Sequence, residues 1–354
     1  MDENRLAGDW SYPTRISAGA GRIAELAEHC ISQGIRAPLL VTDPGIAALP
    51  ICQQTHQACL DAGLDCRIFS SIRGNPTRAN VEEGVVAYRD GSHDGVIAFG
   101  GGSALDVAKA VALMVGQERP LWDFEDLGDN WTRVREESIA PVVAVPTTAG
   151  TGSEVGRAAV ITDEERREKK LIFHPLMLPR QVILDPELTT ALPPQITAAT
   201  GMDALSHNLE ALCSRGFHPM ADGIAMEGIR LVRESLATAV ANGYDLDARM
   251  RMLAASTMGA VAFQKGLGAM HALAHPLGAL YDAHHGLLNA ILMPYVLVAN
   301  REAIAQRLGS AAAYLGLEDN SYEAFLAWVL ELRRQIGIPA SLREIGIDDE
   351  QQRR

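Results

Sequence analysis

The sequence lacks several features that would assign it to other classes of protein. No run of about 18 apolar residues is long enough for a membrane-spanning helix, and Met1-Asp-Glu-Asn-Arg5 resembles no signal peptide. Positive charge is scarce, since 31 lysines and arginines face 44 acidic residues and the net charge is −13. Because phosphate groups are bound by basic patches, we do not expect nucleic acid or an anionic membrane as the main partner. The missing membrane span and signal peptide lead us to expect a cytoplasmic protein.

Cysteine is scarce as well. The five cysteines are odd in number and form no Cys-x-x-Cys pair, so neither a disulfide framework nor a cysteine zinc site is expected. Buried apolar filler is their predicted role. With 354 residues, of which 47% are hydrophobic and 21% charged, the chain has the composition of an ordinary globular protein with one large or two smaller domains.

The first half of the chain alternates strand-like and helix-like segments. Short apolar runs indicate strands at residues 37–42, 65–69, 95–100 and 142–145. Strands that alternate with helices predict an α/β domain with a doubly wound, mostly parallel sheet. The ligands of such sheets bind at the carboxyl ends of the strands.

Long helical segments rich in Ala, Leu and Met replace this pattern after about Pro193. They cover residues 196–213, 221–239, 246–263, 287–300 and 322–336. We therefore expect an α/β domain over residues 1–190 and an all-α domain over residues 191–354.

Two loops of the first half have the composition of nucleotide-binding loops. Gly100-Gly-Gly-Ser103 follows a strand and opens a helix, so its amides favour an anion, and Ser103 and Asp106 could cap that helix. Residues 146–154 also follow a strand and contain three threonines. Asp43, after the first strand, could bond to a ribose and would repel a 2′-phosphate. Tight packing and helix capping are the alternative explanations for the two loops.

Five of the ten histidines lie in three short pieces of the helical half. Asp203 and His207 are four residues apart, as are His271 and His275, so each pair shares one face of a helix. Pro276 is expected to disturb or end the second helix. A single pair of this kind is usually an exposed helix contact, whereas two pairs on apolar helices favour a metal site.

The third piece, Ala283-His-His-Gly286, supplies the remaining histidines. One carboxylate and three imidazoles form a ligand set suited to Fe(II) or Zn(II). The spacing does not decide between His271 and His275, or between His284 and His285.

These motifs occur together, and in the same order, in a known family. The chain resembles the iron-activated (group III) alcohol dehydrogenases, including the lactaldehyde reductases, from Tyr12-Pro-Thr14 to about Ile347. The segments that carry the resemblance are residues 100–103 with Asp106 and Lys109, 146–155, 201–210, 268–279 and 285–290. The resemblance implies a dehydroquinate synthase-like two-domain architecture and a homodimeric, NAD-dependent and metal-dependent alcohol dehydrogenase or aldehyde reductase for a small primary alcohol or aldehyde.

Carried over residue by residue, the resemblance also assigns the site. It implies metal ligands at Asp203, His207, His271 and His285, with Fe(II) favoured over Zn(II). For His275 it implies a role either in proton relay or in orienting a metal ligand. It implies NAD contacts at Asp43, Asn75, Gly101, Gly102, Ser103, Thr147, Thr148, Thr151 and Lys169. Asp106, three residues after the first loop, is also expected to contact the cofactor. Phe263, among the apolar helices, is the expected substrate contact. Without the resemblance, Asn75 is a turn residue and Lys169 a solvated charge in a polar connection.

The expected active site is the cleft between the two domains. There the metal would act as a Lewis acid on the substrate oxygen while hydride passes to NAD and a proton leaves through His275 and the ribose. One alternative is another enzyme of this scaffold, such as glycerol dehydrogenase, maleylacetate reductase or dehydroquinate synthase. The other is an inactive metal- and nucleotide-binding protein, since members of the family usually continue past the position of Arg354.

Overall fold

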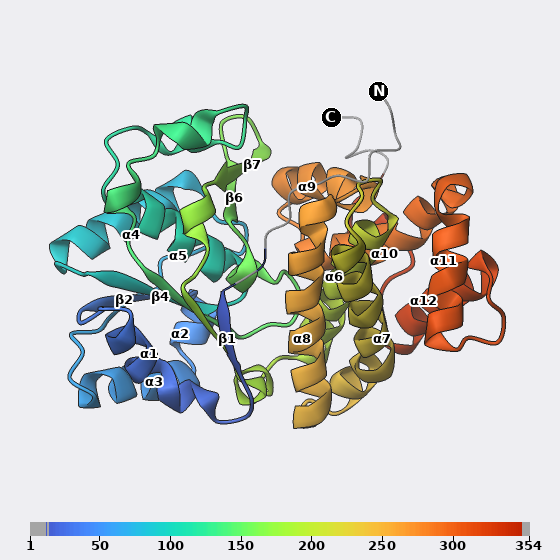
Figure 1. Cartoon of the computed structure of the whole chain (residues 1–354), viewed down its shortest axis with the longest axis horizontal. Helices are drawn as coiled ribbons and strands as arrows, with labels where there is room; N and C mark the ends of the chain where they lie inside the picture. Colours follow the sequence, from blue (N-terminus) through green and yellow to red (C-terminus); the bar gives the residue numbers. More distant parts are fainter. Residues whose placement is uncertain (1–11, 13, 349–354) are drawn as a thin grey trace. The chain divides into compact units, whose positions relative to one another are not determined.

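The computed structural model describes residue 12 and residues 14–348, so Pro13 of the family-like opening lies outside the described residues. The described chain forms two compact units (Figure 1). The sheet unit contains residues 14–148 and 152–189, and the helical unit contains residue 12, residues 149–151 and residues 190–348. The predicted fold class, a doubly wound α/β domain followed by an all-α domain, is confirmed.

Six parallel strands form the sheet in the order β1-β8-β5-β4-β2-β3. Their bounds are β1 (Arg15–Ala18), β2 (Pro38–Val41), β3 (Arg67–Phe69), β4 (Gly95–Gly100), β5 (Val142–Pro146) and β8 (Gln181–Leu184). The four predicted strands are β2, β3, β4 and β5. Because the chain passes from β2 to β3 on one side and then returns to β4 on the other, the order reverses between β2 and β4, where such sheets bind ligands.

Helices lie on both faces of this sheet (Figure 1). They are α1 (Leu26–Ser32), α2 (Pro44–Ala47), α3 (Pro50–Asp61), α4 (Arg78–Asp90) and α5 (Gly102–Met114). The apolar side chains of α1 and α3 pack against β2, β4 and β5 in one core. Four of the five cysteines are buried in this core as free thiols, which confirms their predicted role as filler.

An antiparallel hairpin of β6 (Ala158–Asp163) and β7 (Glu168–Phe173) was not expected. The alternative explanation for Lys169, a solvated charge in a polar connection, does not hold, because Lys169 lies in strand β7, in which Lys170 and Ile172 are buried. The ammonium group of Lys170 is buried 3.2 Å from Asp163 and 3.3 Å from Glu125. Because β7 begins with charged residues, it does not form an apolar run of the kind by which strands were predicted.

The helical unit consists of seven α-helices within the described residues. They are α6 (Pro194–Cys213), α7 (Pro219–Ala241), α8 (Leu246–Ala262), α9 (Ala269–Tyr281), α10 (His285–Ala299), α11 (Arg301–Leu315) and α12 (Tyr322–Gln335). The five predicted segments correspond to α6, α7, α8, α10 and α12. Pro276 does not end its helix, since α9 continues to Tyr281. Since proline has no N–H group, the carbonyl oxygen of Ala272, four residues before Pro276, loses its helical hydrogen-bond donor. Ala272 is exposed, so water can replace this donor.

Helix α6 forms the centre of this unit and packs against α7, α8 and α10 (Figure 1). Residues 201–212 are all buried, so any polar side chain among them needs a partner inside the protein. None of the described helices alone is long and apolar enough to cross a membrane. Helices α10 and α11 satisfy the criteria of length and apolar composition only when taken together, and they are bent by 109° where they meet.

Candidate functional site

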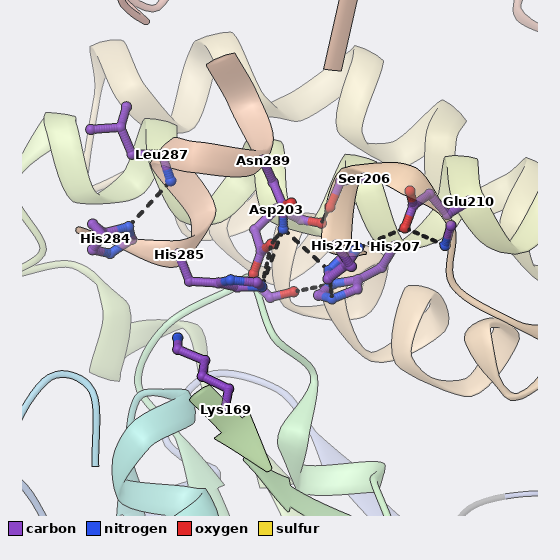
Figure 2. Close-up of polar contacts among 12 residues, drawn as sticks. Lys169, Asp203, Ser206, His207, Glu210, His271, His284, His285, Leu287 and Asn289 are labelled. Atoms are coloured by element: carbon purple, nitrogen blue, oxygen red, sulfur yellow. Dashed lines mark hydrogen bonds and ion pairs between the residues drawn. The ribbon is translucent and has the colours of Figure 1, made fainter. Parts of the chain in front are cut away.

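Three predicted metal ligands meet inside the helical unit. Asp203 and His207 lie one turn apart on α6, and His271 reaches them from α9 (Figure 2). All three side chains are buried, and one ligand atom from each lies within 4.8 Å of the others. The i,i+4 spacing on two buried helices therefore brings these side chains together.

The hydrogen bonds of the two imidazoles fix where their protons are. Nδ1 of His207 is 3.2 Å from the carbonyl oxygen of Gly150, and Nδ1 of His271 is 2.7 Å from Oε2 of Glu210. Since both partners are acceptors, each Nδ1 carries a proton, and in a neutral imidazole the Nε2 then presents a lone pair. The two Nε2 atoms lie only 2.9 Å apart. Lone pairs that face each other at this distance repel, and a shared cation removes the repulsion, so these residues fit a bound metal ion.

The structure distinguishes the two histidines that begin α10. Nε2 of His285 lies 3.8 Å from Oδ1 of Asp203, and its ring centroid lies 5.2 Å from that of His271. His284 is exposed, and its Nδ1 accepts a hydrogen bond from the amide of Leu287, as the N-cap of α10 (Figure 2). Of the two, His285 joins the cluster.

Asn289 also belongs to this cluster, although the sequence analysis did not identify it. It follows His285 by one turn of α10, is completely buried, and donates from Nδ2 to Oδ1 of Asp203 at 2.8 Å. The same nitrogen lies 3.2 Å from Nε2 of both His271 and His285. Its place four residues after His285 was the available signal.

The proposed relay and substrate residues lie beside the same cluster. The half-buried ring of His275 has its centroid 5.9 Å from that of His271 and 5.2 Å from that of His285. The ring of Phe263, directly after α8, lies 5.2 Å from that of His207. A titratable ring and an apolar ring thus border the metal-binding residues.

Burial and charge perturb the titration of the cluster. Burial lowers the pKa of His207 to about 4, although the nearby carboxylate of Asp203 raises it. Burial raises the pKa of Asp203, but the neighbouring histidines and the amide of Asn289 outweigh this and hold it below its ordinary value. At neutral pH, His207 is therefore neutral and Asp203 ionised, which are the states that metal binding requires.

The total charge of the cluster also fits a dication. Asp203 and Glu210 are both buried, and within the described chain neither carboxylate forms an ion pair with a lysine or arginine. Buried carboxylates without cationic partners are costly. Two negative charges, three imidazole nitrogens and a carboxylate oxygen match a divalent transition metal.

The first nucleotide loop lies in the sheet unit at the end of β4. The N-cap of α5 is Gly101, with no side-chain capping bond, so the predicted capping by Ser103 and Asp106 is wrong. Ser103 donates instead to the carbonyl oxygen of Gly74. Helix α5 therefore begins at Gly102 with its first amides uncapped by a side chain, as an anion site requires.

The two loops touch each other at Gly101. A Cβ atom at this position would lie 3.3 Å from the side chain of Thr148, so glycine permits the close approach. The amide of Thr147 donates to the carbonyl oxygen of Gly100 at 2.9 Å, and the Thr147 side chain is buried. Thr151 differs from these residues, because residues 149–151 belong to the helical unit.

Asp106, a predicted cofactor contact, forms hydrogen bonds within the sheet unit. Its Oδ1 accepts from the hydroxyl of Ser153 and its Oδ2 accepts from the amide of Val160 at 2.9 Å. Lys109 lies 3.4 Å away on the same helix. Asp106 is 7% exposed. Its carboxylate connects α5 with Ser153, near the end of the second loop, and with Val160, in the strand that follows it.

Three further predicted cofactor contacts lie near the first loop. Oδ1 of Asp43 caps α2 by accepting from the amide of Ile46 at 3.0 Å, and Oδ2 is 3.6 Å from where a Cβ of Gly100 would be. Nζ of Lys169 donates to Oδ1 of Asn75 at 2.7 Å, although the residues are 94 positions apart. Asn75 follows Gly74, the partner of Ser103, so these residues form one neighbourhood.

Known proteins resemble the chain over nearly its whole length. Residues 13–186 match iron-containing alcohol dehydrogenases, and residues 197–354 match the C-terminal part of the Fe-containing alcohol dehydrogenase family. The 4-hydroxybutyrate dehydrogenase of Cupriavidus necator is 40% identical over 349 residues, which cover 96% of this chain and 90% of that protein. The 1,3-propanediol dehydrogenase of Klebsiella pneumoniae is 37% identical over 351 residues, with 96% and 89% covered.

Solved structures agree with the sequence relatives. A 1,3-propanediol oxidoreductase superposes with a TM-score of 0.90 at 35% identity, over 97% of this chain and 91% of that one. Sulfoacetaldehyde reductase from Bifidobacterium kashiwanohense, solved in complex with NAD+, gives a TM-score of 0.88 at 30% identity, with 98% and 90% covered. The chain therefore belongs to the iron-containing alcohol dehydrogenase family of oxidoreductases, as its motifs predicted.

Proposed function

We propose that the chain is an NAD-dependent and divalent-metal-dependent alcohol dehydrogenase or aldehyde reductase that acts on a small primary alcohol or aldehyde. The observation that carries the proposal is the pair of facing Nε2 atoms of His207 and His271 beside the carboxylate of Asp203. The names of the relatives, which include 4-hydroxybutyrate and 1,3-propanediol dehydrogenases, support an alcohol substrate of modest size.

Asp203, His207, His271 and His285 would hold the metal ion. When bound, a divalent ion supplies Lewis-acid polarisation for an alcohol or carbonyl oxygen. The chain's own contribution is to hold a proton on each Nδ1, through Gly150 and Glu210, so that each Nε2 is directed inward. Iron is proposed ahead of zinc because of the family.

The loops of the sheet unit would hold NAD. Uncapped amides at the start of α5 suit the pyrophosphate, and the carboxylate of Asp43 suits a ribose and repels a 2′-phosphate. Gly101 and Gly102 have no side chain to obstruct the close approach of a phosphate to the backbone, and Thr148 lies directly beside Gly101. When bound, the nicotinamide supplies the hydride acceptor or donor. A solved relative in complex with NAD+ supports this choice of cofactor.

His275 would carry the proton. Its ring lies beside His271 and His285 and is partly exposed, so it can exchange a proton with solvent. Phe263 would contact the carbon chain of the substrate, since it presents an apolar ring next to His207. A homodimer stays a prediction from the family resemblance, and a cytoplasmic location stays a prediction from the sequence.

The test is purification without air, followed by elemental analysis and an assay of the metal-loaded protein with NADH and a panel of small aldehydes. We expect about one metal ion per chain and NADH oxidation with at least one short aldehyde, and the same preparation treated with a chelator should be inactive. Bound metal and bound NADH without oxidation of NADH would contradict the proposed activity.

A further inference from the structure

Glu210 has no part in the mechanism above, but it lies within the cluster. It follows His207 by three residues and Asp203 by seven, so all three share one face of α6. Its side chain is 4% exposed. In Figure 2 its carboxylate points toward the ring of His271.

Three hydrogen bonds end on this carboxylate. Oε2 accepts from the amide of Gly268 at 2.8 Å and from Nδ1 of His271 at 2.7 Å, and Oε1 accepts from the amide of Met270 at 2.6 Å. Gly268 is the N-cap of α9 and has no capping side chain of its own. Glu210 therefore joins α6 to the beginning of the helix that presents His271.

Capping alone does not require a charged group. The two amides at the start of α9 need an acceptor, and the amide oxygen of a glutamine could supply one. The bond to His271 has a different consequence. Because it holds the ring proton on Nδ1, it directs the lone pair of Nε2 toward His207 and Asp203.

The charge of Glu210 strengthens this effect. Both side-chain oxygens of Glu210 accept hydrogen bonds, from the amides of Gly268 and Met270 and from Nδ1 of His271, and this arrangement of donors fits an ionised carboxylate. A carboxylate on Nδ1 makes Nε2 a better electron donor. His207 has only the neutral carbonyl of Gly150 at the corresponding position. The two imidazoles are thus polarised unequally.

We propose that Glu210 is a positioning residue of the metal site, whose negative charge, acting through the imidazole of His271, sets the affinity of the site for a divalent cation. The proposal rests on the proposed function only in treating the cluster as a metal site. It does not depend on the substrate or on NAD.

The test is the affinity of the whole chain for Zn²⁺, measured by competition with a chromogenic chelator. Glu210→Gln keeps the size of the side chain and an acceptor oxygen but removes the charge. We expect affinity to fall about 10–100-fold, the usual cost of losing an outer partner of a metal ligand. Glu210→Asp, which keeps the charge, should recover part of the loss.

The matched control is Asp245→Asn in the same unit. Asp245 caps α8 by accepting from the amide of Ala248 at 2.9 Å, so its variant also removes a charge from a helix cap. We expect this variant to bind Zn²⁺ within about twofold of the wild type. A purely structural role for Glu210 would lower the melting temperature of Glu210→Gln and leave its Zn²⁺ affinity unchanged, and that result would overturn the proposal.

A second measurement needs no variant and decides the matter if Glu210→Gln does not fold. Nitrogen-15 NMR of histidine-labelled, metal-free wild type reports which ring nitrogen of His271 is protonated. We expect a proton on Nδ1, and an Nδ1 that carries no proton would contradict the proposed role. Wild-type protein that binds no Zn²⁺ would overturn both this role and the proposed metal site, whereas equal binding by wild type and Glu210→Gln would overturn only the role of Glu210.

Discussion

The ammonium group of Lys109 lies 3.4 Å from the carboxylate of Asp106, and both side chains are buried inside the sheet unit. Lys109 also donates to the carbonyl oxygens of Ser153, at 3.0 Å, and of Ala158. Burial lowers the pKa of Lys109, and the neighbouring Asp106 opposes this shift. The pair connects α5, which begins at the first nucleotide loop, with the chain after the second loop.

Replacing Lys109 by Met should therefore be costly. The variant leaves Asp106 buried without its cation, and such a change destabilises a protein by about 3 kcal/mol or more. Urea denaturation of wild type and variant measures the loss. Arg78→Met is the control, since Arg78 pairs with Glu82 on the surface at the same distance of 3.4 Å, and such pairs contribute about 1 kcal/mol or less. Equal losses of unfolding free energy in the two variants would show that the buried pair stabilises the protein no more than the surface pair does.

The preference for NAD over NADP should depend on Asp43. A carboxylate near the 2′-position repels a phosphate, and such a contact between like charges costs several kcal/mol. We expect Asp43→Gly to raise kcat/KM for NADP+ relative to NAD+ by about tenfold or more, which corresponds to about 1.4 kcal/mol. Steady-state kinetics with both cofactors measure the ratio.

The same variant removes the cap on α2, so a second substitution is needed. Asp43→Asn keeps an oxygen for the amide of Ile46 while it removes the charge. Both variants should shift the ratio in the same direction. If the ratio for Asp43→Asn stays at the wild-type value, Asp43 does not face the cofactor ribose.

His284 and His285 provide a matched pair for testing the metal site. His285 lies beside Asp203, whereas the neighbouring His284 is exposed and caps α10. We expect His285→Ala to weaken Zn²⁺ binding by more than the roughly 10–100-fold that loss of an outer partner costs. His284→Ala should change Zn²⁺ affinity little and reduce stability by about 1 kcal/mol through the lost cap. Chelator competition and urea denaturation separate the two effects, and the reverse pattern would exclude His285 as a ligand.

Much of the site was predictable because its parts are local in sequence. The i,i+4 spacing of Asp203 and His207 predicted a shared face, and α6 has that face buried. The glycines of residues 100–102 predicted a loop between a strand and a helix, which the structure has. Family resemblance was needed to prefer His285 over His284, and the capping geometry of His284 now gives a physical reason.

The features that could not be predicted depend on contacts between residues that are far apart in the sequence. Glu210 and Asn289 reach their partners His271 and Asp203 across 61 and 86 positions, so the local spacing could place each of them on a helix face but could not identify its partner. Strand β1 has four residues of which only Ser17 is buried, and it shows no apolar run. Helix α9 passes through Pro276, where tertiary packing outweighs the loss of one backbone bond.

The stability of the metal-free protein should fall on mild acidification because of His207. Its pKa is about 4 in the folded protein and about 6.5 in an unfolded chain. Between these values the unfolded state binds the additional proton, so the free energy of unfolding decreases as the pH falls. From pH 7 to pH 5 this group alone should remove about 2 kcal/mol. The depressed pKa of Asp203 acts only below its ordinary value of 3.8, outside this window.

Urea denaturation of chelator-treated protein at pH 7 and pH 5 measures this effect. In His207→Gln no imidazole has to remain neutral at this position, so the loss of stability between the two pH values should be smaller than in wild type by about 2 kcal/mol. His56→Gln is a control in the sheet unit, since His56 contacts the carbonyl oxygen of Cys66 far from the cluster in sequence. If wild type and His207→Gln lose the same stability, His207 is not held neutral by its burial, and the lone pair assigned to its Nε2 would be filled by a proton.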